Sequence, residues 1–308
     1  MTAPITLSHR AEYYGLLGAV GALRRLSVRR AGDIGALIGR LIYRPFGVRR
    51  DVVERQVRAA FPGLAEAEVL RIARASFGNL GRTTIETAVL PRKSSEAVLG
   101  LFDIIDNWAI VEQSLARGRG LLLVSGHLGN WELAGSYIAA RGLRMEAVAR
   151  RMQNPLFDQY LTATREDVGM HIIHDADAVR RVPRVIRGGG IVGFLIDQGA
   201  AGLASTWVPF FGRYAKTPRG PAVFALRLDA PVVFTCAVRE PDGKYSMRFE
   251  EVVVARTGDR ERDVDAIVSA YTSTLERWVR RYPEQYFWQH RRWKHQRPGT
   301  PSELGDPS

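Results

Sequence analysis

The sequence predicts an α/β fold, in which helices flank a mixed, mainly parallel sheet and a helical N-terminal segment precedes it. From about residue 101 onward, short apolar runs of strand length alternate with helical stretches, a pattern typical of parallel strands joined by helices. Before that point, apolar residues recur at helical spacing. The chain has 308 residues, 46% hydrophobic and 25% charged, so it can bury such a core without disulfides.

The first part of the chain, from about residue 8 to 90, is predicted to be helical. Residues 51–61 repeat apolar side chains at helical spacing and stop at Pro62-Gly63. Residues 65–90 predict a second, longer amphipathic helix, which Pro91 ends.

Residues 13–46 alternate apolar and basic patches. The longest apolar run, over 13–23, is about 11 residues long, whereas a membrane span needs roughly 20. The pattern favours a helix that lies on an anionic membrane surface. An ordinary amphipathic helix packed on the domain would show the same pattern.

The second part of the chain contains the predicted strands. Six apolar runs are assigned to them: 121–124, 145–149, 171–173, 191–196, 232–238 and 247–254. A last helix is expected over 264–282. We therefore expect a helical, membrane-associating segment over 1–95 and an α/β domain over 96–295. A Pro-, Gly- and Ser-rich tail over 296–308 is expected to be disordered.

The most informative run is SGHLGNWE, residues 125–132, which directly follows the apolar strand 121–124. His127 therefore falls at the carboxyl end of a buried strand, where open α/β sheets bind ligands. Glu132 can reach His127 only from the first turn of the next helix. A histidine oriented by a carboxylate is a general base that would deprotonate a hydroxyl of the substrate. A core histidine that hydrogen-bonds a helix-start glutamate is the structural alternative.

Two other strand ends carry charged side chains. Arg150 and Arg151 follow the strand 145–149, and a guanidinium matches the geometry of a phosphate, although a solvated surface pair is equally typical. Asp197 follows the apolar strand 191–196, so it could orient a ligand or pair with Arg150.

The formal net charge of +12 favours an anionic partner, such as nucleic acid, anionic lipid or an acidic carrier protein. No nucleic-acid-binding motif is present, so we expect no nucleic-acid partner. The single cysteine, Cys236, indicates a reducing setting and, inside an apolar run, is not expected to act as a nucleophile. His171 and His174 have no clustered third donor, so no metal is expected.

The chain resembles the lysophospholipid acyltransferase superfamily, in particular its late lipid A acyltransferase branch. The segment SGHLGNWE matches the His-x4-Asp/Glu motif of that family. Further blocks follow in the expected order: residues 50–62, Ala149-Arg150 with Asn154-Pro155, Ile196-Asp197-Gln198, 208–212 and 283–292.

The resemblance implies an O-acyltransferase in which His127 is the base and Glu132 orients it. Backbone amides at the helix start, such as those of Leu128 or Gly129, would hold the oxyanion. Substrate contacts are expected from Arg150, Arg151, Asp197, Asn130, Phe210 and Arg291. Phe210 would contact the acyl chain, or else it belongs to the core.

The acyl group would come from an acyl-carrier-protein or coenzyme A thioester, with no other cofactor. It would go to a hydroxyl of an anionic glycolipid or lysolipid, such as a lipid A precursor, at the cytoplasmic face of the inner membrane. The aromatic-basic segment 288–294 could dock on that surface or on the domain. A thioesterase or lysophospholipase with the same dyad, and a non-catalytic basic membrane-surface protein, are the alternatives.

Overall fold

The computed structural model describes residues 5–91, 93–199 and 202–307, so the ends of the predicted first segment and tail, residues 1–4 and 308, lie outside it. The helices are α1 (Leu7–Leu23), α2 (Val28–Tyr43), α3 (Arg50–Ala60), α4 (Glu66–Val89), α5 (Ser95–Leu99), α6 (Trp108–Ala116), α7 (Trp131–Ala140), α8 (Pro155–Asp167), α9 (Ala178–Arg187), α10 (Gly220–Leu228) and α11 (Arg260–Arg281). The strands are β1 (Phe102–Asp106), β2 (Leu121–Ser125), β3 (Met145–Ala149), β4 (Met170–His174), β5 (Ile191–Leu195), β6 (Ser205–Phe210), β7 (Arg213–Pro218), β8 (Val232–Arg239) and β9 (Tyr245–Val252).

The predicted fold class is confirmed. Seven strands form one mixed sheet in the order β1-β9-β8-β2-β5-β3-β4, in which only the β8–β9 pairing is antiparallel. Since β2, β5 and β3 are parallel neighbours, the residues that follow them meet at one edge of the sheet. This edge is where the predicted site residues gather.

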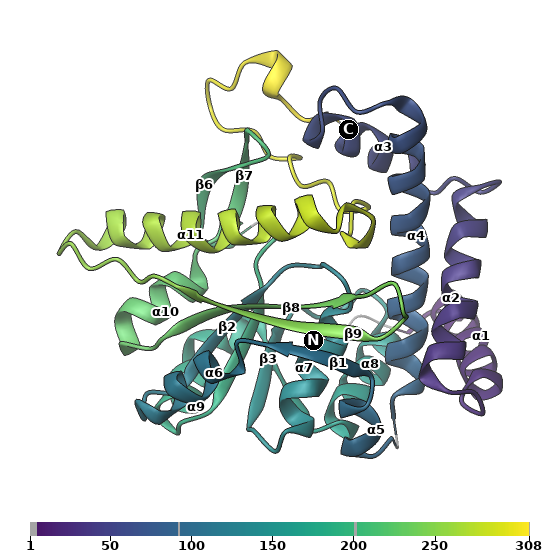
Figure 1. The fold of residues 1–308 in the computed structure, drawn as a ribbon, viewed down its shortest axis with the longest axis horizontal. Coiled ribbons are helices and arrows are strands. Elements are labelled where there is room, and N and C mark those ends of the chain that lie inside the picture. The colour runs from purple at the N-terminus through teal and green to yellow at the C-terminus, as the bar shows by residue number, and fades with distance from the viewer. Residues whose placement is uncertain (1–4, 92, 200–201, 308) are drawn as a thin grey trace.

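The sheet has a buried cluster on each face. Along β2, Leu122 and Val124 belong to one cluster and Leu121 and Leu123 to the other, because successive side chains of a strand point to opposite faces. Helix α11 lies along one face, and α5, α6 and α7 cover the other (Figure 1).

The N-terminal helices stand at one end of the sheet, where α2 runs beside α4 (Figure 1). Their contact is made by glycines: a Cβ on Gly35 would collide with the carbonyl of Gly81, and one on Gly39 with that of Phe77. Such close backbone approach turns the small residues of α2 inward and leaves its large aliphatic residues outside. No helix in the described ranges is long and apolar enough to cross a membrane.

Three segments differ from the sequence-based expectation. Strand β1 was not predicted, because most of its residues are exposed and its sequence shows little apolar periodicity. The antiparallel hairpin β6–β7, which is absent from the six predicted strands, turns at Phe211 and Gly212 with φ of +52° and +73°. The tail, expected to be disordered, has a 3-10 turn over Ser302–Leu304 and contacts the domain, with Gly305 accepting a hydrogen bond from Arg213.

Candidate functional site

His127 lies in a tight turn between β2, a central strand, and α7. Gly129 has a φ of +64°, and a Cβ there would collide with the carbonyl of Ala237, so only glycine fits. Asn130 then caps α7, because its Oδ1 accepts from the backbone N–H of Leu133 at 3.0 Å. The turn holds the His127 side chain at the sheet edge with 15% of its surface exposed.

The carboxylate that contacts His127 is Asp197, at the end of β5. Its Oδ1 lies 2.7 Å from His127 Nδ1, and its Oδ2 accepts the backbone N–H of the same histidine at 2.9 Å. An ionised carboxylate only accepts, so Nδ1 carries the proton and Nε2 is left as the basic atom. Asp197 therefore fixes both the ring orientation and the tautomer of His127.

The charge of Asp197 is preserved although its side chain is buried. Burial alone would raise its pKa, but the charge and hydrogen bonds of His127, together with the charge of Arg292, hold the pKa well below its usual range. Arg292 is itself buried and donates to the Lys216 carbonyl at 2.8 Å. The carboxylate thus remains ionised behind the imidazole.

Glu132 does not occupy the predicted place beside the imidazole. Its two oxygens accept from Nε and Nη2 of Arg165, on α8, at 2.9 and 2.6 Å. Among the described residues, no hydrogen bond joins Glu132 to His127. Burial alone would raise the pKa of Glu132, but the charge and hydrogen bonds of Arg165, together with the charge of His127, lower it, so the carboxylate stays ionised. The expected orienting contact is made by Asp197 instead.

Asp197 was expected either to orient a ligand or to pair with Arg150. In the structure it pairs with His127 instead. Arg150 extends from the end of β3 with 67% of its side chain exposed, and its Nε lies 4.0 Å from Asp175 Oδ2. Arg151 is similarly exposed and lies 3.7 Å from Asp158. Both arginines flank the edge that carries His127, and their phosphate contacts stay a prediction.

Two other predicted substrate contacts are buried. Asn130 is fully buried and donates to Glu86 Oε2 at 2.8 Å, so it could reach a substrate only if the helix start rearranged. Phe210 is also fully buried, in ring contact with Phe211, Tyr286 and Trp293, which corresponds to the core alternative. Arg291 forms an ion pair with Asp306 of the tail.

The C-terminal aromatic-basic segment docks on the domain. Trp288 and Trp293 are fully buried, and Gln56 of α3 donates to the Trp288 carbonyl at 2.6 Å. Phe287, the residue before this segment, contacts the site, because its backbone N–H donates to the His127 carbonyl at 2.9 Å. This hydrogen bond ties the C-terminal part of the chain to the turn that carries His127.

The sequence did not identify several groups that shape the site. Gln198 follows Asp197, and its Nε2 lies 3.2 Å from His127 Nε2. Helix α4 supports the turn, since Asn79 and Thr83 both donate to the Gly129 carbonyl. Arg165 lies near the C-terminal end of α8. Only the contacts of α4 have a signal in the sequence, because polar residues stand there at positions where the helical spacing predicts apolar ones.

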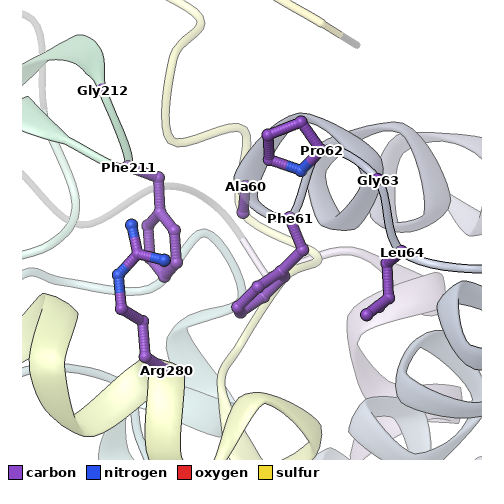
Figure 2. Close-up of a pocket in the computed structure, with 8 residues that line it drawn as sticks. All are labelled: Ala60, Phe61, Pro62, Gly63, Leu64, Phe211, Gly212 and Arg280. Carbon is purple, nitrogen blue, oxygen red and sulfur yellow. The ribbon is translucent and has the colours of Figure 1, made fainter.

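A separate pocket of about 530 Å³ opens beside the hairpin β6–β7. Figure 2 shows the rings of Phe61 and Phe211 side by side and Arg280 beside Phe211. The Arg280 guanidinium lies 4.4 Å from the Phe211 ring centroid. The fully buried Trp288 contacts both rings.

No group of three or more His, Cys, Asp or Glu side chains in the described ranges could hold a metal ion. The sheet edge presents an oriented general base, His127 against Asp197, with Arg150 and Arg151 beside it. Cys236 is buried in β8 with its thiol pKa raised by burial, so it does not provide a nucleophile.

Comparison with known proteins gives a consistent result. The model of the bacterial lipid A biosynthesis acyltransferase family matches residues 5–295. The lipid A biosynthesis lauroyltransferase of Escherichia coli is 26% identical over 275 residues, which cover 87% of each chain. The palmitoleoyltransferase of the same organism is 26% identical, over 85% of this chain and 84% of its own. A phosphatidylinositol mannoside acyltransferase of Mycobacterium tuberculosis is 25% identical, over 70% and 68%.

Proposed function

Because the chain belongs to the bacterial lipid A biosynthesis acyltransferase family and is an acyltransferase, we propose that it acylates a hydroxyl of an anionic glycolipid. The donor is an acyl-carrier-protein or coenzyme A thioester. The relatives act, by their names, on lipid A and on phosphatidylinositol mannoside, which are both glycolipids. A lipid A precursor is the first acceptor to test.

The observation that carries the mechanism is the contact of His127 with Asp197. Asp197 keeps the proton on Nδ1, so Nε2 can take the proton of the acceptor hydroxyl as its oxygen attacks the thioester carbonyl. The buried carboxylate then stabilises the imidazolium. When the intermediate collapses, Nε2 returns the proton to the leaving thiolate. Such acid–base catalysis contributes roughly 10²–10⁴-fold to the rate.

The test is transfer by the purified protein. Acyl-carrier-protein and coenzyme A thioesters would each be incubated with the lipid A precursor, and the acylated lipid measured by mass spectrometry. We expect product with at least one donor and none with His127→Ala of unchanged thermal stability. More than a tenth of the wild-type rate in folded His127→Ala would contradict the mechanism. Free fatty acid in place of acylated lipid, with acceptor present, would favour the hydrolase.

We further propose that α2 is the membrane-docking surface. Its outer face carries five large aliphatic side chains that are 37–54% exposed: Ile34, Leu37, Ile38, Leu41 and Ile42. The exposed arginines Arg30, Arg40 and Arg44 lie along and beyond this row. An apolar stripe flanked by cations suits the interface of an anionic bilayer. As part of the same proposal, we take this bilayer surface to be the cytoplasmic face of the inner membrane.

Vesicle sedimentation tests the docking surface. The double variant Leu37→Glu/Leu41→Glu should lose binding to vesicles rich in anionic lipid while its thermal stability is unchanged. Val179→Glu/Val253→Glu is the matched control, because Val179 and Val253 are also exposed but lie elsewhere. Equal binding by both double variants would refute the assignment of α2, although His127-dependent transfer could still occur.

A further inference from the structure

The backbone N–H groups of residues 127–130, the turn that carries His127, are all paired within the protein. His127 N donates to Asp197 Oδ2 at 2.9 Å, and Leu128 N donates to the Gly126 carbonyl at 2.8 Å. Gly129 N and Asn130 N donate to the carbonyls of Gln285 and Ala237 at 3.0 and 2.8 Å. The expected oxyanion donors, Leu128 and Gly129, are therefore already paired within the protein.

A side-chain donor stands at the reacting atom instead. The amide Nε2 of Gln198 lies 3.2 Å from His127 Nε2 and 3.5 Å from Nδ1. An atom at these two distances stands over the face of the imidazole, so the in-plane lone pair of Nε2 stays free, while Nδ1–H is directed to Asp197. Because Gln198 directly follows Asp197 at the end of β5, the strand that orients the base also positions this amide.

We propose that Gln198 is a catalytic residue that stabilises the oxyanion during acyl transfer. This inference rests on the proposed function. In the free protein the amide nitrogen stands over the face of the imidazole, 3.2 Å from Nε2, and leaves the in-plane lone pair of Nε2 to the acceptor hydroxyl. The incoming hydroxyl donates to Nε2 in the ring plane. The carbonyl carbon bonds to the hydroxyl oxygen, so the carbonyl oxygen can turn toward the amide on that face of the ring.

The proposed step balances as follows. The hydroxyl proton moves to His127 Nε2, the hydroxyl oxygen bonds to the carbonyl carbon, and the carbonyl π pair moves to its oxygen. The Gln198 N–H donates to that oxyanion. This hydrogen bond stabilises the transition state more than the ground state, because the negative charge is present only in the former. The C–S bond then breaks, the carbonyl re-forms, and the imidazolium protonates the thiolate. Ester and free thiol are the products.

The indole of Trp131 also lies beside the imidazole. Its ring meets that of His127 edge-on, with centroids 4.8 Å apart, and its side chain hydrogen-bonds to Glu132. Trp131→Phe removes this donor and keeps an aromatic ring, so it is the matched comparison for Gln198→Met, which removes the amide and keeps the length of the side chain.

The experiment compares kcat and KM for transfer, and thioester hydrolysis without acceptor, in wild type, Gln198→Met, Gln198→Glu, Trp131→Phe and His127→Ala. Both reactions form an oxyanion. Gln198→Met should therefore lower kcat of both by roughly 10²–10³-fold, as for loss of one oxyanion donor, at unchanged melting temperature and KM. Gln198→Glu should lose more, because a carboxylate repels the oxyanion.

Four results would overturn the assignment: kcat within threefold of wild type in Gln198→Met, a raised acceptor KM with hydrolysis intact, a gain of activity, or a loss in Trp131→Phe that exceeds the loss in Gln198→Met. If Gln198→Met lowers the melting temperature, the folded Gln198→Glu variant decides by the same criteria. An active Gln198→Met beside an inactive His127→Ala would refute only this inference. An active His127→Ala would refute the proposed mechanism itself.

Discussion

Asp197 holds His127 at two points, because one carboxylate oxygen accepts from the ring and the other from the backbone N–H of the same residue. A carboxamide can accept at only one of these points. In Asp197→Asn, the amide group must face either the backbone N–H, which it cannot bond, or Nδ1. If it faces Nδ1, the proton is driven to Nε2 and the base is lost.

We therefore expect Asp197→Asn to lower kcat by roughly 10²–10⁴-fold, the range of general-base catalysis. Transfer assays measure the loss, and ¹⁵N NMR of His127 should show the change of tautomer. Asp177→Asn removes a half-exposed carboxylate from the surface and should behave as wild type. Wild-type kcat in Asp197→Asn would show that the carboxylate is not needed.

The pair of Glu132 with Arg165 predicts a cost in stability as well as in activity. Glu132→Gln leaves the largely buried Arg165 without its charge partner, which should destabilise the fold by about 3–5 kcal/mol. Arg165→Met should cost a similar amount. Because the two costs share one interaction, the double variant should be more stable than their sum implies. Denaturant unfolding of the three variants checks this, and strictly additive losses would argue against the pair.

Arg150 is expected to bind the acceptor. Arg150→Ala should raise the acceptor KM by roughly 10–100-fold, since a charge-assisted hydrogen bond of about 1.5–3 kcal/mol is lost. Hydrolysis of the thioester by water should be unchanged. Arg180→Ala, which alters an arginine that is 75% exposed on another element, is the control. Equal loss of transfer and hydrolysis would assign Arg150 a structural role.

His290 predicts a loss of stability in mild acid. Burial lowers its pKa to about 4, helped by the positive charges of Arg292 and His127 and opposed by Asp197. The unfolded chain takes up a proton below about pH 6.5, whereas the folded protein does so only near pH 4. Stability present above pH 6.5 is therefore lost as the pH falls, by up to about 3 kcal/mol. Melting curves should show a smaller decline in His290→Gln, and parallel curves would contradict this account.

Gly35 tests the contact of α2 with α4. A methyl group there meets the carbonyl of Gly81, so Gly35→Ala should destabilise the protein by about 1–3 kcal/mol through overpacking. Gly18→Ala in α1 is the matched control, because open space surrounds that position. It should be neutral or stabilising by up to about 1 kcal/mol. Similar melting temperatures for the two variants would show that the helices can separate.

The strands and the catalytic edge could be predicted because buried parallel strands leave continuous apolar runs. These runs located His127 and Asp197 at two strand ends, but they carry no information on strand order. Only the adjacency of β2 and β5 makes Asp197 the partner of His127. The short sequence separation of five residues favoured Glu132 as the partner of His127. Glu132 pairs with Arg165 of α8 instead, and a pairing between distant helices leaves no periodic signal in the sequence. Hairpin β6–β7 was missed because its turn places Phe211, instead of glycine or asparagine, at a positive φ.

Gly78 and Asn79 are neighbours on α4 that face different parts of the protein. Gly78 packs against α2, whereas Asn79 donates to the Gly129 carbonyl at 2.9 Å. One rigid helix thus spaces the proposed lipid-facing surface from the catalytic imidazole. With α2 lying on the bilayer, α4 sets the height of Nε2 above the acyl chains. Hydroxyls carried at another depth in the headgroup layer would then be out of reach, so the enzyme would select its acceptor by elevation as well as by chemistry.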